Sequence, residues 1–159
     1  MPRAKTLRQI QQAAAQYSQQ VQGNRHLREE VKQANPYQLI KMLYAALESH
    51  LDAGLSALER GDTVSATRCL DKAHSSINYL RACLSPEFYP ELYETLDALY
   101  DYMGQRLVTA RLKHEVAAVQ EVQELLRPLQ EAWVEVETTA DELYKDFVPA
   151  DYDSLSESG

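Results

Sequence analysis

The chain has 159 residues, 45% of them hydrophobic, which is enough for one domain with a core and too few for two domains of ordinary size. Its 5 Gly and 6 Pro argue against a turn-rich all-β fold, and its net charge of -8 argues against binding to nucleic-acid phosphates. No apolar run could span a bilayer, and the N-terminus lacks the apolar centre of a secretory signal. We therefore expect a cytoplasmic protein that does not insert into a membrane.

Residues 1–34 form an N-terminal arm with six basic and two acidic side chains. Its apolar residues recur every three or four positions, as in an amphipathic helix, at Leu7, Ile10, Ala14, Tyr17 and Val21. The pair Gly23-Asn24 interrupts this pattern. Because so narrow a stripe is not stable alone, we expect the arm to lie in a groove of the main domain.

Residues 35–136 contain four amphipathic segments. Asn35-Pro36 is typical of an N-cap followed by proline at the first helical position, and Gly61 is a C-terminal stop, which predicts a helix over about residues 36–60. Asp62 or Thr63 caps a second helix with an apolar seam of Ala66, Leu70, Ala73, Ile77, Leu80 and Leu84.

A third helix is predicted from about Pro90 to Lys113, after the break at residues 85–90. A turn near His114-Glu115 leads to a fourth helix, whose apolar face carries Val119, Val122, Leu126, Leu129, Trp133 and Val136. Short turns between four such helices favour an all-α fold, an antiparallel up-down four-helix bundle. Residues 137–159, with one basic and seven acidic side chains, are expected to form a mobile acidic tail.

The sequence contains no recognisable catalytic or metal-binding constellation. None of the four His residues follows a Glu by three positions, as in bundle di-metal sites, and no Gly-rich phosphate loop or nucleophile elbow is present. Cys69 and Cys83 lie fourteen positions apart on one predicted helix, too far to bridge, and are interpreted as small hydrophobic residues. We expect no enzyme activity, no cofactor and no metal.

The third predicted helix carries more large apolar residues than one buried stripe requires. Leu92, Leu96, Leu99, Met103, Leu107 and Ala110 can face a core, while Tyr93, Tyr100 and Tyr102 fall beside or outside that stripe. Such a surplus predicts a partner protein.

Two blocks of sequence resemble the FliS family of flagellar secretion chaperones. The block Leu96 to Lys113, LDALYDYMGQRLVTARLK, is followed by Ala132-Trp133, and the block Val31 to Tyr44, VKQANPYQLIKMLY, matches the opening of the family's domain. The resemblance implies a chaperone that binds the C-terminal segment of flagellin, prevents premature polymerisation and passes it to a membrane protein of the export gate. From the apolar stripe of the arm itself, we expect the arm to be displaced from its groove when a client binds.

The positions that match the two blocks are our candidates for partner binding. The apolar matches, which core packing explains more readily than partner binding, are Leu39, Leu43, Leu107 and Ala110. Met42, Tyr44, Tyr100 and Met103 are of types that suit half-exposed, adaptable surfaces. Arg106 could contact the partner or form a salt bridge to a neighbouring helix.

Some residues depart from the family pattern. Ala45-Ala46 replaces the usual Asp-Gly, and Pro128 falls within the fourth predicted helix, where we expect a kink or a lost bond to Glu124. Two alternatives therefore stay open: an adaptor of the same fold that binds another flagellar protein, such as an anti-sigma factor, and a structural helical dimer that buries its surplus aromatic residues against itself.

Overall fold

The computed structural model describes residues 4–21, 23–84, 90–135 and 145, with side chains from residue 8 onward. Those residues form six helices and no strand, so the predicted all-α class is confirmed. Apart from Lys145, the predicted acidic tail lies outside the described residues, as do Val136 and the segment 85–89.

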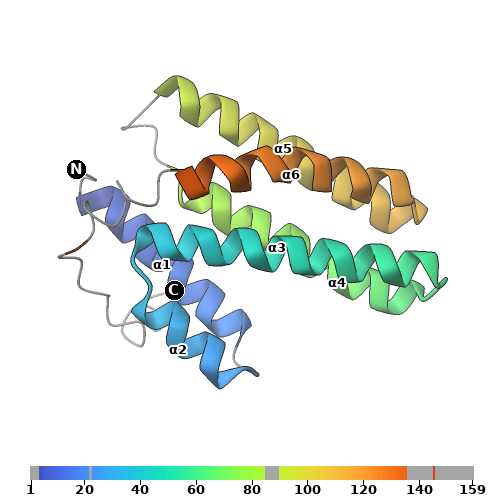
Figure 1. The fold of residues 1–159 in the computed structure, drawn as a ribbon, viewed down its shortest axis with the longest axis horizontal. Helices are drawn as coiled ribbons and strands as arrows, with labels where there is room; N and C mark the ends of the chain where they lie inside the picture. Colours follow the sequence, from blue (N-terminus) through green and yellow to red (C-terminus); the bar gives the residue numbers. More distant parts are fainter. Residues whose placement is uncertain (1–3, 22, 85–89, 136–144, 146–159) are drawn as a thin grey trace.

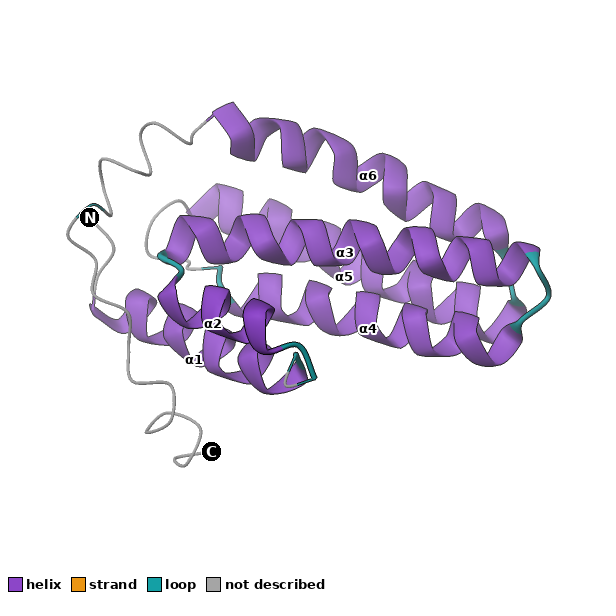
Figure 2. Ribbon diagram, turned by 60° about the horizontal axis from the view of Figure 1, so that its bottom comes forward, coloured by secondary structure: helices purple, strands orange, loops and turns teal. Residues whose placement is uncertain are grey.

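Four long helices form the main body of the molecule (Figures 1 and 2). They are α3 (Pro36–Glu59), α4 (Thr63–Ala82), α5 (Pro90–Lys113) and α6 (Val116–Glu135). Each helix packs against the next one along the chain, and α6 packs back against α3. The result is a closed, antiparallel four-helix bundle.

The bundle helices begin and end where local side chains satisfy their terminal backbone groups. Asn35 and Gln38 form a reciprocal capping box, in which the Gln38 amide donates to Asn35 Oδ1 at 2.8 Å and the Asn35 amide to Gln38 Oε1 at 3.0 Å. Asp62 caps α4 by accepting from the Ser65 amide at 3.1 Å. The turn before it requires Gly61, whose φ of 74° lies in the left-handed region.

The core consists of a continuous cluster of buried aliphatic side chains contributed by all four bundle helices. Among those with the least exposed surface are Leu39, Leu43, Leu47, Leu51, Leu70, Ile77, Leu80, Met103, Leu107 and Leu126. α3 and α4 approach closely at Gly54, where an added Cβ would lie 2.9 Å from Leu70 Cδ2. A side chain at this position would therefore require the Leu70 side chain to shift.

The N-terminal arm is folded as two helices rather than one. α1 (Ala4–Gln20) and α2 (Arg25–Gln33) pack against each other, and α1 also contacts α4 and α3 (Figure 1). Asn24 caps α2 by accepting from the Leu27 amide at 3.0 Å. The apolar stripe of α1 is buried at Ile10 and Tyr17, and the Tyr17 ring meets that of Tyr79 on α4 edge-on, with centroids 5.7 Å apart. The side chain of Leu7 lies outside the described part.

Pro128 does not interrupt α6, which runs unbroken from Val116 to Glu135. The proline side chain is exposed, so its ring meets solvent rather than the core. None of the described helices combines the length and the apolar character needed to cross a bilayer.

Candidate partner-binding surface

The structure places most of the predicted partner-binding residues in the core. Seven of the nine are buried: Leu39, Leu43, Tyr44, Tyr100, Met103, Leu107 and Ala110. Met42 and Arg106 are half-buried. The interpretation of Tyr44, Tyr100 and Met103 as half-exposed residues is therefore wrong for this structure, and a client could touch them only if helices moved apart.

Tyr44 and Tyr100 are buried because each satisfies the other's hydroxyl group. Their phenol oxygens lie 2.6 Å apart in a hydrogen bond between α3 and α5. Burial raises the pKa of both hydroxyls, so the pair is neutral at every physiological pH. Sequence patterning assigns tyrosine to a surface because its hydroxyl needs a partner, and here the partner is a second tyrosine from a distant part of the chain.

Arg106 forms the predicted salt bridge to a neighbouring helix. Its Nε lies 2.7 Å from Glu121 Oε2 on α6, and a guanidinium nitrogen lies 3.5 Å from Glu115 Oε1. The hydroxyl of Tyr102 also donates to Glu121. The Tyr102 hydrogen bond, followed by that of Arg106, holds the pKa of Glu121 below its usual value. These contacts clamp the second half of α5 to the first turns of α6.

Beyond this clamp, both α5, toward its start, and α6 carry apolar side chains that remain partly accessible. Leu96 and Leu99 of α5 and Leu125 and Leu129 of α6 pack against the core without being fully buried. Leu92 continues the same helical stripe one turn earlier and is 51% exposed. We call these five residues the α5–α6 seam.

Within the seam, exposure is greatest toward the start of α5. α5 has 24 residues and α6 has 20, and the two are antiparallel with a tight turn at His114. The first turn of α5 carries Leu92, which lies on the same stripe as the core-packed leucines but remains exposed, and the pattern of α5 alone does not show this.

Other exposed apolar residues lie away from the seam. Val108 and Leu112 of α5 and Val64 of α4 are 36%, 68% and 69% exposed. A small cavity of about 90 Å³ lies between α4 and α5, and the ion pair between Arg111 and Asp71, at 2.8 Å, borders it. These residues are separate and mixed with charges, so they do not form one apolar surface.

Nothing in the described part of the chain resembles a metal centre: no group of three or more His, Cys, Asp or Glu side chains there could hold an ion. Cys83 is buried, which raises the pKa of its thiol to about 12, whereas Cys69 is half-buried; both are free thiols. The described part of the bundle therefore offers a ligand mainly apolar surface between charged helix faces.

Comparison with known proteins identifies the family. Residues 7–140 match the family described as flagellar protein FliS. The chain belongs to the FliS family. The flagellar secretion chaperone FliS of Salmonella typhimurium is 40% identical over 111 residues, which cover 69% of this chain and 82% of that protein.

Two further relatives carry the same name. The flagellar secretion chaperone FliS of Escherichia coli is 37% identical over 106 residues, covering 66% of this chain and 78% of the relative. That of Vibrio cholerae is 31% identical over 103 residues, covering 65% and 76%. The resemblance drawn from the two sequence blocks is confirmed, and the family match includes α1 and α2 as well as the bundle.

Proposed function

We propose that this protein is a cytoplasmic export chaperone that binds the C-terminal segment of flagellin, prevents its premature polymerisation and delivers it to the membrane export gate. Membership in the FliS family and relatives named flagellar secretion chaperones support a chaperone of flagellar export. Binding of the C-terminal flagellin segment and delivery to the export gate go beyond what the family name states.

The observation that carries the proposal is the α5–α6 seam. A chaperone for an unfolded segment needs apolar surface that is accessible and yet continuous with a rigid core, because ordering the client costs much of the contact energy. Leu92 is more than half exposed, yet it follows the stripe of Leu96, which packs on the core. An amphipathic helix laid along this stripe would cover leucines that remain partly exposed.

The nine residues that match the family's two blocks differ in how accessible they are to a client. Met42 and Arg106 are accessible enough to touch a client directly. The seven buried residues would shape the seam from beneath, and their contact with a client stays a prediction. Replacing both Tyr100 and Met103 by polar residues should unfold the protein rather than weaken binding selectively, because the polar atoms would be buried without partners.

Co-purification tests the proposal directly. The full chain should retain intact flagellin and lose flagellin that lacks its C-terminal segment. Leu92→Glu should weaken binding about tenfold or more, because it removes apolar contact and places a charge in the interface. Val64→Glu is the matched control: Val64 is 69% exposed on α4, away from the seam, and its replacement should leave binding unchanged.

The other outcomes separate the alternatives. Equal retention of both flagellin forms would overturn the C-terminal assignment. Binding to an anti-sigma factor in place of flagellin would favour an adaptor that serves another flagellar protein. An obligate dimer in sedimentation analysis would favour a structural helical dimer. The expected result is a chain that forms a one-to-one complex with flagellin.

A further inference from the structure

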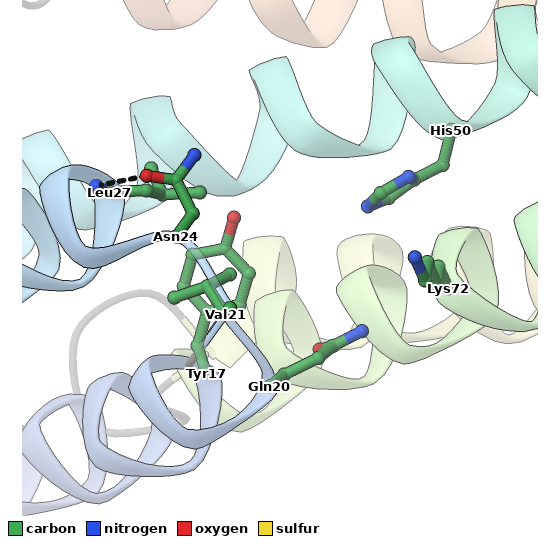
Figure 3. A pocket seen from close by; sticks show the side chains of 8 residues that line it. Tyr17, Gln20, Val21, Asn24, Leu27, His50 and Lys72 are labelled. Atoms are coloured by element: carbon green, nitrogen blue, oxygen red, sulfur yellow. Dashed lines mark hydrogen bonds between the residues drawn. The ribbon is translucent and has the colours of Figure 1, made fainter.

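A pocket of about 240 Å³ lies beneath the elbow where α1 turns into α2 (Figure 3). Its walls come from four helices and the turn between α1 and α2, because the elbow closes over the surface of α3 and α4. Its lining includes Tyr17, Gln20, Val21, Leu27, His50 and Lys72.

The polar side chains of this pocket converge from three helices. His50 of α3 and Lys72 of α4 point into the space from one side, and Gln20 and the hydroxyl end of Tyr17 reach it from α1 (Figure 3). Among the described residues, neither His50 nor Lys72 has an acidic partner within ion-pair distance. The Lys72 ammonium group therefore has no carboxylate counter-charge among the described residues.

The charge of the pocket at neutral pH is close to one positive unit. Burial, followed by the charge of Lys72, lowers the pKa of His50 below 6.5, so the imidazole is neutral at pH 7. The titratable groups that face it are Lys72 from α4 and Tyr17 from α1, and the pocket residue of α2, Leu27, is apolar. A ligand with a single negative charge would match this environment better than a dianion.

We propose that this pocket binds a carboxylate group, the side chain of an acidic residue or the C-terminus of a peptide. The Lys72 ammonium would supply the charge-assisted hydrogen bond, while the His50 imidazole and the Gln20 amide would donate to the second oxygen. Val21 and Leu27 give the pocket an apolar wall that suits the methylene groups of such a residue. Its volume accommodates one side chain, not a folded element.

The carboxylate can come from this chain or from another molecule. Residues 137–159 carry seven acidic side chains and follow α6, whose last turns are bonded to the start of α3 through Trp133 and Tyr37. The 24 residues after Glu135 span at most about 80 Å when extended, and His50 lies only about 21 Å along α3 from its first residue. The segment that carries these acidic residues is therefore long enough to supply the carboxylate to the pocket. A partner peptide is the other source.

Side-chain NMR of the four histidines tests this site, with the His50 signal assigned from the His50→Gln variant. The samples are the full chain and a full-length variant in which the seven acidic residues of 137–159 are changed to their amides. Each is titrated with sodium acetate against sodium chloride at matched ionic strength. In the amide variant, acetate should move the His50 signal to saturation and raise its pKa, because a nearby anion favours the imidazolium.

Two further variants of this amide chain show whether the pocket is responsible. Lys72→Met should weaken the acetate response about tenfold, since it removes a charged hydrogen-bond donor. Lys113→Met, which removes an exposed lysine of α5 outside the pocket, should leave the response unchanged.

Comparison of the two chains identifies the source. If the acidic residues of the chain occupy the pocket, the full chain should show a higher His50 pKa and a weaker acetate response than the amide variant. If both respond equally, the pocket serves the carboxylate of another molecule. The proposal is overturned if acetate produces no saturating shift in the amide variant, or if the Lys72→Met protein responds as strongly.

Discussion

Tyr37, in the first turn of α3, and Trp133, in the last turn of α6, hold each other by two reciprocal hydrogen bonds and by ring stacking. The Tyr37 hydroxyl donates to the Trp133 carbonyl at 3.2 Å, and Trp133 Nε1 donates to the Tyr37 carbonyl at 3.3 Å. The rings are 5.4 Å apart with an interplanar angle of 12°. This contact closes the bundle between its first and last helices, at the end where the α5–α6 seam is open.

Trp133→Ala should lower the free energy of unfolding by about 2–3 kcal/mol, somewhat less than for a fully buried tryptophan, because the indole is half-buried. Trp133→Phe should recover most of this loss, since it keeps the stacking and loses only the indole hydrogen bond. Urea denaturation of both variants measures the difference. Equal stability of the alanine variant and the parent would show that the contact does not hold α6.

The buried phenol pair gives a second prediction. Tyr100→Phe should cost about 1–3 kcal/mol, because it leaves the Tyr44 hydroxyl buried without a partner. The Tyr44→Phe change should cost a similar amount, and the double change should cost less than the sum of the two. A double-mutant cycle by denaturation measures this coupling, and strictly additive losses would argue against a shared hydrogen bond.

Stability should depend on pH through His50. Its pKa is lowered in the folded protein, so the unfolded chain takes up a proton first as the pH falls below about 6.5. The contribution of His50 is thus fully present above pH 6.5 and decreases below it, until the folded-state pKa is reached. Stability measured in urea at pH 5, 6 and 7.5 should fall less steeply in His50→Gln than in the parent.

Val64→Gln is the control for this series, because Val64 is an exposed, non-titratable residue of α4. Its replacement should retain the parental slope with pH. A His50→Gln protein with the same slope as the parent would contradict the predicted role of His50.

Much of the fold can be predicted from local sequence, because helix ends are set by local chemistry. Asn35-Pro36, Gly61-Asp62 and Gly23-Asn24 stand at the helix boundaries that their side chains predict. The orientation of α5 is harder to predict, because apolar residues occur on more than one of its faces. The structure turns Tyr100 inward and leaves Leu92 exposed, since burial depends on contacts with other helices, such as that between Tyr100 and Tyr44.

For the candidate partner-binding surface, the sequence predicts the helix involved but not the individual residues. The surplus of apolar residues on α5 indicates a partner, but the pattern does not show which residues the other helices leave uncovered. The sequence does not distinguish Leu125 of α6 from a core leucine, because its exposure depends on how α6 is rotated against α5. The pocket at His50 likewise requires the elbow between α1 and α2 to close over α3 and α4.

Removal of residues 1–22 should tighten client binding. α1 covers part of α3 and α4 with Ile10 and Tyr17, so a client segment that extends onto this face must displace it. Titration of the truncated protein with flagellin, beside circular dichroism to confirm that the bundle is folded, measures the effect. Unchanged or weaker affinity would indicate that α1 does not compete with the client.

The measurement that tests the central claim most directly is isothermal titration calorimetry of the full chain with the C-terminal segment of flagellin at several temperatures, beside circular dichroism of the mixture. Burial of the seam by an ordering helix predicts one-to-one binding, a negative heat-capacity change and a gain in helicity, all weakened by Leu92→Glu and unaffected by Val64→Glu. No heat and no gain in helicity at micromolar concentrations would contradict it.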